Sequence, residues 1–357
     1  MFDVLPFFHA SATDQKDPPS RCVIVNSSPP SLTVLMTVFN AGRFLDPAIR
    51  SIVGQSFRNW EFLIVDDAST DGSIEVVEGW ALRDDRIRVV RNEVNKGQTP
   101  CLNQGLQMAR GAWIARQDAD DLSHPTRLSE QFQFVTMHPE VALLGTCGRI
   151  IDDQDRLVGL LDDPLSAAAA DWTAPFLNPF THTAVFFRAA IVRDELGGYD
   201  ENFRIAQDYD LWTRVMARHP VANHPLRLIC YRHLEGSLSK AGRQDAFTEA
   251  DRVSLREGER IFGRTLNENE RALLTAFREG LGPENQAAFW RFYQGERKKF
   301  EAARECDLSR TVALHHLKAA GALLGRSRRA ACTEIWQAFR GDWRATVGWL
   351  LARYGRS

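Results

Sequence analysis

The chain contains 357 residues, of which 44% are hydrophobic and 25% are charged. This composition is typical of a globular protein and excludes a disordered, collagen-like or coiled-coil chain. The formal net charge of -2 is too close to neutral for a protein whose surface as a whole binds nucleic acid.

No segment has the composition of a membrane-spanning helix or of a secretion signal. The apolar runs fall short of the ~18 residues that a spanning helix needs, and the apolar patch near Met1 has no basic residues before it. The six cysteines are scattered and form no C-x-x-C pair, which is typical of reduced thiols. We therefore expect a cytoplasmic protein that lies at most on the inner face of a membrane.

Strand and helix signals alternate along the first part of the chain. Residues 1–30 contain proline pairs and no apolar periodicity, which predicts a mobile leader. Strands are then predicted at residues 32–39, 61–67, 86–91 and 112–118. Each is followed by a predicted helix, and these helices start at Asp46-Pro47, near Asp71, around Cys101 and at His124-Pro125. The alternation predicts right-handed crossovers and a parallel sheet with helices on both faces.

The remaining chain is less regular. Strand patterns recur at residues 142–147, 183–188 and 225–232, and an amphipathic helix is predicted from Asp208. Beyond about residue 241 the strand signal ends, and segments rich in Ala, Arg, Glu and Leu predict helices to the end. We therefore predict an α/β catalytic domain at residues 31–240 and a helical C-terminal region at residues 241–357.

The sharpest chemical signal is the acidic run Asp118-Ala119-Asp120-Asp121, which directly follows a predicted strand. Carboxylates this close repel one another unless a cation lies among them, and Mg²⁺ or Mn²⁺ prefers such oxygen ligands. In the alternative interpretation, one aspartate caps the next helix and the others are solvated. Because ligands bind at the carboxyl ends of parallel strands, the position of the run favours a metal site.

Polar residues also follow two other predicted strands. Thr37 and Asn40 lie at the end of one strand, and Asp66 and Asp67 lie at the end of the next. There, a carboxylate oxygen could accept the imino N–H of a pyrimidine ring, and Asp67 is the stronger candidate. The alternative is a turn in which the side chains of Asp66 and Ser69 bond the local backbone.

A third acidic motif, Asp208-Tyr209-Asp210, begins the amphipathic helix. One interpretation makes Asp208 a general base, and the alternative is that a carboxylate there only caps the helix. A helix N-terminus stabilises the ionised form, so we expect the pKa of Asp208 to be lowered and its strength as a base to be reduced.

Several common catalytic motifs are absent. The sequence has no G-x-G-x-x-G after its first strand and no G-x-x-x-x-G-K-[ST], H-E-x-x-H or G-x-S-x-G. Their absence argues against dinucleotide oxidoreductases, P-loop NTPases, zinc proteases and α/β-hydrolases. Without a phosphate-binding loop, the phosphates of a ligand would have to be held by a metal.

Taken in order, the motifs resemble the family 2 glycosyltransferases, inverting enzymes of the GT-A fold. The resemblance covers about residues 31–240 and is carried by T-V-F-N, V-D-D-A-S-T-D-G-S, N-K-G, D-A-D-D, H-P-T-R-L, G-G-Y-D and A-Q-D-Y-D-L-W. It implies a Rossmann-like α/β catalytic domain, to which the helical C-terminal region is appended. It also implies that Asp208 is the catalytic base and that Asp120 coordinates Mn²⁺ or Mg²⁺. The nucleotide-binding residues that it implies are Thr37, Val38, Asn40, Asp67, Asp118 and Ala119.

Two positions depart from the family pattern. The acidic residue that usually precedes the base is Gln207, which leaves Asp208 without one neighbouring negative charge. The histidine found after the last strand in many members is replaced by Leu234, and His233 stands one position off. We therefore interpret His233 as a surface residue.

The resemblance implies a metal-dependent transferase that moves a sugar from a UDP- or dTDP-sugar to a hydroxyl of a glycan or lipid-linked acceptor, in surface polysaccharide synthesis. One alternative is a phosphoryl-transfer enzyme like the haloacid dehalogenases. Their acidic motif opens the fold and ends in Thr, whereas here the motif lies late and ends in Asp121. Another alternative is a catalytically silent sugar-nucleotide binder, although the acidic positions expected for the metal ligand and the base are filled, by Asp120 and Asp208.

The C-terminal region combines basic and aromatic residues. Residues 290–357 contain fourteen Lys and Arg against six Asp and Glu. Aromatic residues are interleaved with the arginines, namely Trp290, Phe292, Trp336, Phe339, Trp343, Trp349 and Tyr354. Helices of this kind can lie on anionic lipid, which predicts peripheral membrane contact. The alternative is that the aromatic residues pack on the catalytic domain and the arginines are solvated.

Overall fold

The computed structural model describes residues 30–234, 243–323, 328–342 and 346. The predicted leader therefore lies outside the described residues, except for Pro30. The first part of the chain alternates strands and helices as expected. Its elements are β1 (Leu32–Val38), α1 (Leu45–Val53), β2 (Trp60–Asp66), α2 (Ser73–Ala81), β3 (Ile87–Arg91), α3 (Gln98–Met108), β4 (Trp113–Arg116), β5 (Leu122–Ser123) and α4 (Arg127–Met137).

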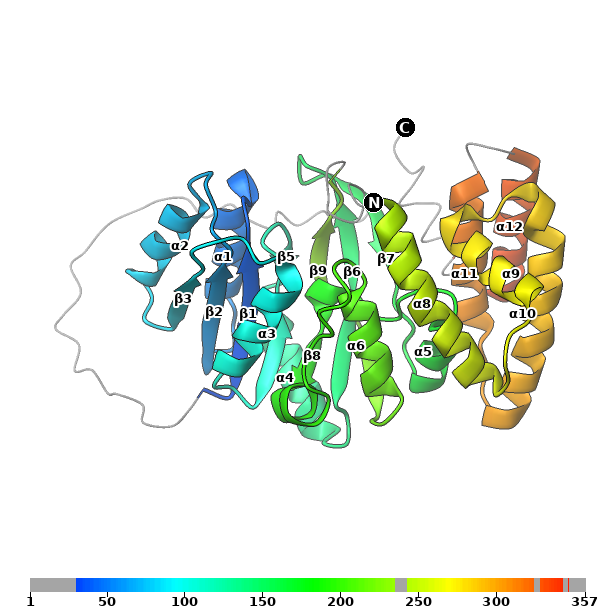
Figure 1. Cartoon of the computed structure of the whole chain (residues 1–357), viewed down its shortest axis with the longest axis horizontal. Coiled ribbons are helices and arrows are strands. Elements are labelled where there is room, and N and C mark those ends of the chain that lie inside the picture. The colour runs from blue at the N-terminus through cyan, green and yellow to red at the C-terminus, as the bar shows by residue number, and fades with distance from the viewer. Residues whose placement is uncertain (1–29, 235–242, 324–327, 343–345, 347–357) are drawn as a thin grey trace, which may run out of the picture.

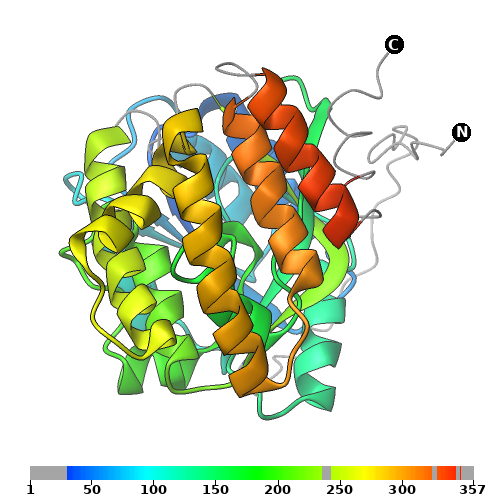
Figure 2. The same cartoon turned by 90° about the vertical axis from the view of Figure 1, so that its right-hand side faces the viewer.

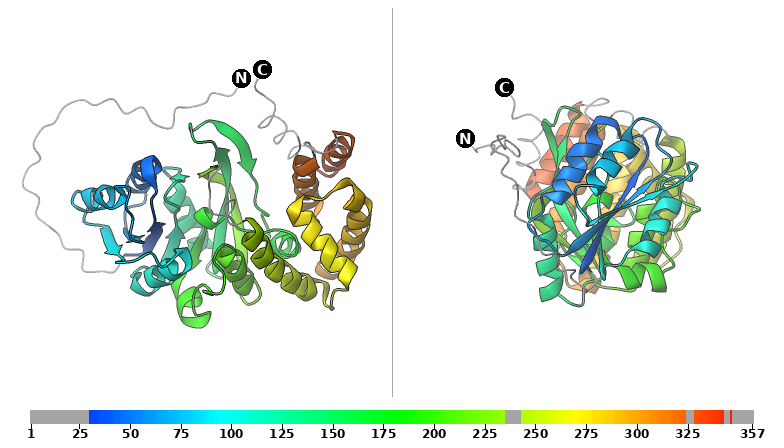
Figure 3. Two further views of the ribbon diagram at one scale, coloured as in Figure 1. Left: turned by 45° about the horizontal axis from the view of Figure 1, so that its top comes forward. Right: turned by 90° about the vertical axis from the view of Figure 1, so that its left-hand side faces the viewer.

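Strands β1 to β4 form one side of a single sheet whose order is β3-β2-β1-β4-β8-β6-β9-β5, and the short β5 pairs with β9 at the other end. The pairs β3–β2, β2–β1 and β1–β4 are parallel. All seven residues of β2 are buried, since helices cover both faces of the sheet (Figure 3). Helices α1, α2 and α4 pack on one face, and α3 packs on the other.

The second half of the sheet is mixed, so the prediction of a parallel sheet is correct only for the first four strands. Strand β8 (Phe186–Arg188) is antiparallel to both of its neighbours, β4 and β6 (Leu143–Ile151). The reason is that a hairpin of β6 with β7 (Leu157–Leu161) and the short helix α5 (Ala167–Thr173) replace the β–α–β crossovers. Strand β9 (Val221–Arg232) completes the sheet beside β6 and follows α6 (Gln207–Met216).

Two predicted helix starts are wrong by one to three residues. Helix α1 begins at Leu45 instead of being capped by Asp46, whose carboxylate accepts hydrogen bonds from Arg50 and Trp80. Helix α4 begins at Arg127, and the backbone N–H of Leu128 in its first turn donates to the side chain of Gln55. In both places tertiary contacts replace the local capping signal.

The C-terminal region is helical, as predicted. The helices among its described residues are α8 (Arg243–Phe262), α9 (Glu268–Gly280), α10 (Pro283–Arg304), α11 (Ser309–Leu323) and α12 (Arg328–Gly341). Figure 1 shows α9 to α12 beyond the end of the sheet, and Figure 2 shows them from the front, coloured from yellow to red. No helix among the described residues has the length and apolar character needed to cross a bilayer.

An aromatic core joins the C-terminal helices to the sheet domain. Trp172 of α5 donates a hydrogen bond of 2.7 Å from its indole to the hydroxyl of Tyr293 on α10. Phe176 packs against the ring of Tyr293 and against that of Phe289. These side chains are fully buried, so the helices pack directly on the part of the chain that contains the sheet.

The aromatic residues of the C-terminal region divide into two groups. Trp290 and Phe292 are half-buried and pack against the aromatic core. Their ring contacts are with C-terminal helices, for example Trp290 with Phe277 and Phe292 with Phe262, so they pack within the helical region and not directly on residues 31–240. Trp336 on α12 is 59% exposed. Trp343, Trp349 and Tyr354, and the side chain of Phe339, lie outside the described residues.

Candidate active site

The ends of β1, β2 and β4 lie side by side, as the sequence predicts. In the parallel register Val38 pairs with Asp66 across β1 and β2. The buried guanidinium of Arg116, at the end of β4, bridges two of these ends. It donates to Thr37 Oγ1 at 3.3 Å and to Asp118 Oδ1 at 2.6 Å. Thr37, Val38 and Asp118 therefore lie at one edge of the sheet.

Asn40 fixes the loop that follows β1. Its φ of +51° lies in the left-handed region, which asparagine adopts more readily than most residues. The Asn40 side-chain oxygen accepts a hydrogen bond of 2.8 Å from the backbone N–H of Thr70, and its own N–H donates to Ser69 Oγ. The loops after β1 and β2 are thereby tied together.

Asp67 is buried and holds a third loop. One oxygen accepts hydrogen bonds of 2.9 Å from Asn92 Nδ2 and from the backbone N–H of Lys96. The other oxygen accepts a hydrogen bond of 2.8 Å from the N–H of Gly97. Burial alone would raise the pKa of Asp67, but these hydrogen bonds outweigh it and lower the pKa. Next to it, Asp66 accepts from the N–H of Ser69, which is the local turn expected for that residue.

The three carboxylates of the D-A-D-D run have different surroundings. Asp118 pairs with Arg116, and its backbone N–H donates to Thr183 Oγ1. Asp121 is buried, and its Oδ1 accepts a hydrogen bond of 2.6 Å from the backbone N–H of Arg232 at the end of β9. Neither these two nor Asp120 caps α4, whose N-terminus has no side-chain cap. The capping interpretation is therefore wrong.

The carboxylate of Asp120 accepts no hydrogen bond from any other residue in the described part of the chain. Burial, and after it the charge of Asp118, raise the pKa of Asp120 to about 6. A divalent cation would relieve this unfavourable charge, so the donor set fits one. Within the described ranges, no three His, Cys, Asp or Glu side chains surround a common point. Asp120 could therefore supply only part of a coordination shell, as in Mg²⁺ sites that phosphates and water complete.

Asp208 lies in the first turn of α6. Its Oδ2 accepts a hydrogen bond of 2.8 Å from Asn178 Nδ2, and its Oδ1 accepts one of 2.8 Å from the backbone N–H of Tyr209. Burial, reinforced by the charge of Asp118, nevertheless raises the pKa of Asp208 to about 7. The expectation of a lowered pKa at the helix terminus is wrong, because burial outweighs the N-terminal hydrogen bonds.

The side chain of Tyr231 lies close enough to the acidic residues of the D-A-D-D run and to Asp208 for their charges to affect its pKa. Tyr231, next to the end of β9, has a raised pKa, first through burial and then through the charges of the four carboxylates Asp118, Asp120, Asp121 and Asp208. The structure thus brings together the D-A-D-D run, with Ala119 in it, and the start of α6. Asp67 lies two strands across, at the same edge of the sheet.

Several residues of this site have no sequence signal that we recognised. Asn178 and Thr183 come from the segment between β7 and β8. Arg116 and Arg232 stand at the ends of predicted strands, but neither arginine belongs to a motif that indicates a role in the site. Arg232 also donates from its guanidinium to the backbone oxygen of Asp120 at 2.8 Å. By contrast, the neighbouring His233 is exposed, as predicted.

Comparison with known proteins identifies the family. The model of the family Glycosyl transferase family 2 matches residues 33–193. The putative glycosyltransferase EpsE of Bacillus subtilis is 38% identical over 194 residues, which cover 53% of this chain and 67% of EpsE. The amylovoran biosynthesis glycosyltransferase AmsE of Erwinia amylovora is 33% identical over 199 residues, which cover 54% of this chain and 73% of AmsE. The chain belongs to the family 2 glycosyltransferases.

Solved structures confirm the GT-A fold. TarS 1-349 of S. aureus, in complex with UDP-GlcNAc, aligns with a TM-score of 0.54 at 15% identity, over 91% of this chain and 93% of that one. The mannosyltransferase PcManGT of Pyrobaculum calidifontis, in complex with GDP-Man and Mn²⁺, aligns with a TM-score of 0.52 at 19% identity. The alignment covers 93% of this chain and 89% of PcManGT. The fold and the family together exclude the haloacid-dehalogenase alternative.

Proposed function

We propose that this protein is a metal-dependent inverting glycosyltransferase with Asp208 as its base. The observation that carries the proposal is that a carboxylate with a pKa of about 7 lies in the same site as the carboxylate of Asp120, which accepts no hydrogen bond from any other residue that the structure describes. A group with a pKa near neutrality is well suited to accept a proton at physiological pH. We further propose that residues 31–240 form the catalytic domain.

The reaction follows from this arrangement. Asp208 accepts the proton of an acceptor hydroxyl while that oxygen attacks the anomeric carbon of the donor sugar. The bond between this carbon and the diphosphate oxygen breaks, and the nucleoside diphosphate leaves from the opposite face. A single displacement inverts the anomeric centre. Mn²⁺ or Mg²⁺, when bound by Asp120, would neutralise the charge that develops on the leaving diphosphate.

We assign the nucleotide to the strand ends, with Thr37, Val38, Asn40, Asp67, Asp118 and Ala119 as its binding residues. The carboxylate of Asp67 accepts hydrogen bonds from Asn92, Lys96 and Gly97, and the thiol of Cys101 also bonds to it. Because one carboxylate oxygen can accept more than one hydrogen bond, we propose that Asp67 also accepts the imino N–H of uracil or thymine. We therefore favour a UDP- or dTDP-sugar, and the UDP-GlcNAc complex of TarS supports this choice.

The acceptor is proposed to be a glycan or a lipid-linked sugar in surface polysaccharide synthesis. This part of the proposal is supported by the name of AmsE, which refers to amylovoran biosynthesis. A lipid-linked acceptor would suit a protein that lies on the inner face of the membrane. The exposed Trp336 among the basic C-terminal helices is the described residue that would contact lipid.

A donor screen tests the proposal. The purified protein is incubated with UDP-, dTDP- and GDP-sugars, with and without Mn²⁺ or Mg²⁺, and released nucleotide is measured. We expect metal-dependent release from a UDP- or dTDP-sugar, and product with inverted anomeric configuration by NMR once an acceptor is found. Binding of UDP without release under any of these conditions would instead support the silent sugar-nucleotide binder.

A further inference from the structure

Helix α8 lies between α6, which carries Asp208, and the bundle formed by α9 to α12 (Figure 1). It belongs neither to the segment that the family model matches nor to the predicted catalytic domain. Its side chains nevertheless contact the segments on both sides of Asp208.

The first contact is made by Glu249 of α8. Its carboxylate accepts hydrogen bonds from three consecutive backbone N–H groups, those of Arg204 (3.0 Å to each oxygen), Ile205 (2.8 Å) and Ala206 (2.9 Å). Ala206 is the N-cap residue of α6 and cannot provide a side-chain cap. Glu249 therefore accepts from the N-cap N–H of α6, as the glutamate of a capping box does, and from the two N–H groups before it. Its negative charge is also favourable at a helix N-terminus.

The second contact is with the loop that carries Asn178, the side chain that donates a hydrogen bond to Asp208. Ser254, also on α8, donates a hydrogen bond of 2.5 Å to the backbone oxygen of Pro175. Asn178, three residues further on, donates to Asp208. The hydroxyl of Tyr209 donates to the backbone oxygen of Ala174 in the same loop. The loop and α6 are thus fixed to each other and to α8.

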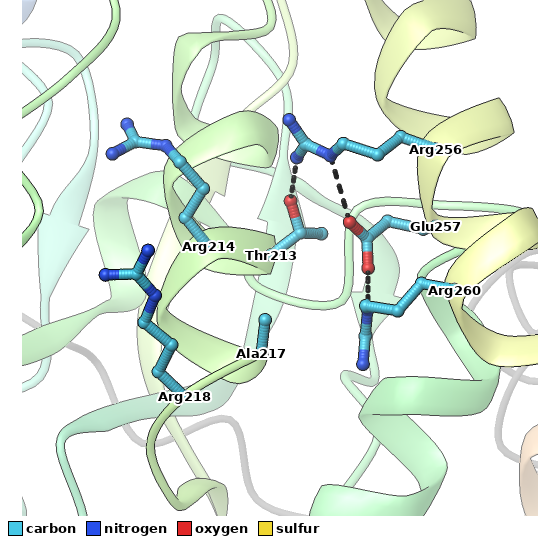
Figure 4. A pocket seen from close by; sticks show the side chains of 7 residues that line it. All are labelled: Thr213, Arg214, Ala217, Arg218, Arg256, Glu257 and Arg260. Atoms are coloured by element: carbon cyan, nitrogen blue, oxygen red, sulfur yellow. Dashed lines mark hydrogen bonds and ion pairs between the residues drawn. The ribbon is translucent and has the colours of Figure 1, made fainter.

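The third contact continues along α6. Arg256 donates to Asp210 Oδ1 at 2.7 Å and to Thr213 Oγ1 at 2.6 Å, as Figure 4 shows for Thr213. Thr213 and Arg256 lie at a pocket of about 220 Å³ between α6 and α8. The arginines of α8 at this pocket, Arg256 and Arg260, are ion-paired with Glu257.

We propose that Glu249 is a positioning residue for Asp208, and that α8 is thereby a functional part of the transferase. The proposal rests on the role of Asp208 in the proposed function. Without the Glu249 carboxylate, three N–H groups directly before α6 lose their acceptor, and the first turn of α6 can shift. A displacement of about 1 Å in a catalytic group can cost about a hundredfold in rate.

The test compares Glu249→Ala and Glu249→Gln in the full chain, with a UDP-sugar identified by the donor screen. We expect kcat to fall about 10- to 100-fold in Glu249→Ala and about 3- to 10-fold in Glu249→Gln, which retains one acceptor oxygen. The KM for the donor should stay within about twofold of wild type in both. Glu259→Gln is the matched control, because Glu259 lies on the same helix but pairs with Arg271, away from α6.

Two further readouts separate positioning from a general loss of folding. Rates are expressed per UDP-binding site, counted by calorimetry, so that unfolded protein does not contribute. Hydrogen exchange should accelerate at the amides of residues 204–206 in Glu249→Ala and stay unchanged in β1. If Glu249→Ala transfers sugar within about twofold of the wild-type rate per site, the proposal is wrong. Should Glu249→Ala fail to fold, the same criterion applies to Glu249→Gln.

Asp208→Asn distinguishes failure of this proposal from failure of the proposed function. Loss of transfer in Asp208→Asn, together with unchanged transfer in both Glu249 variants, removes only the positioning role. Unchanged transfer in Asp208→Asn removes the base itself, and the positioning role with it.

Discussion

The side-chain amide of Asn178 donates its 2.8 Å hydrogen bond directly to the carboxylate of Asp208. This bond favours the ionised form and partly offsets the effect of burial, which leaves the pKa raised to about 7. In Asn178→Ala the pKa of Asp208 should rise further. Since only ionised Asp208 can accept a proton, kcat/KM should increase with pH through this pKa, and the increase should move to higher pH in the variant. A profile of kcat/KM against pH measures the shift, and an unchanged profile would contradict this role of Asn178.

Replacing Asp208 tests whether this residue acts in the transfer step and not in nucleotide binding. Asp208→Asn keeps the shape of the side chain but cannot accept a proton, so we expect turnover to fall about 10²- to 10⁴-fold. UDP affinity by calorimetry should be unchanged, because no nucleotide-binding residue is altered. Asp194→Asn is the control, since Asp194 is an exposed partner of Arg193. Near wild-type transfer by Asp208→Asn would remove Asp208 from the base role.

Among the described residues no other residue donates a hydrogen bond to the carboxylate of Asp120, and this leads to a prediction about the metal. In the wild type, Mn²⁺ should strengthen the binding of UDP, because the cation joins the carboxylate to the diphosphate. In Asp120→Ala this gain should be lost, while UDP binding in EDTA should be retained, because a negative charge near the phosphates has been removed. Titration calorimetry with and without Mn²⁺ measures both. An equal Mn²⁺ effect in the two proteins would show that the metal binds elsewhere.

The sequence predicted the edge of the sheet where the site lies, because the signals for it are local. Strands β1 and β2 are continuous apolar runs, and the polar residues that follow them have to lie at their carboxyl ends. The same reason applies to the acidic run after β4, whereas the start of α6 is marked by acidic residues that open an amphipathic helix.

The partners of these residues were not predictable in the same way. Glu249 contacts backbone more than 40 residues earlier, and Arg232 contacts Asp121 across 111 positions. No local pattern marks such pairs. The pKa of Asp208 was misjudged because the helix terminus is visible in the sequence, whereas the burial that outweighs it depends on the tertiary structure.

Asp67 has a structural role that can be measured apart from the nucleotide. Its hydrogen bonds to Asn92, Lys96 and Gly97 hold the loop before α3, so Asp67→Asn should lower the free energy of unfolding by about 1–3 kcal/mol at neutral pH. The pKa of Asp67 is lowered in the folded state, so its contribution is present above the unfolded-state pKa and is lost as pH falls through the folded-state pKa. Denaturant unfolding of the variant and wild type should therefore converge at acidic pH. A difference that is independent of pH would contradict the role of the ionised carboxylate.

The exposed Trp336 allows membrane contact to be tested without removing any helix. A chain cut near residue 290 would lose Tyr293 and Phe300 from the aromatic core, so flotation of such a fragment would report on misfolding. In the full chain, Trp336→Ser should weaken binding to vesicles of phosphatidylglycerol about tenfold, because the indole no longer enters the interface. Binding to phosphatidylcholine should be weak for both proteins, and added salt should reduce binding to the anionic vesicles. Leu82→Ser is the control, because Leu82 is exposed beside α2, at the other end of the molecule. Equal flotation of Trp336→Ser and wild type would mean that α12 does not contact the lipid through this residue.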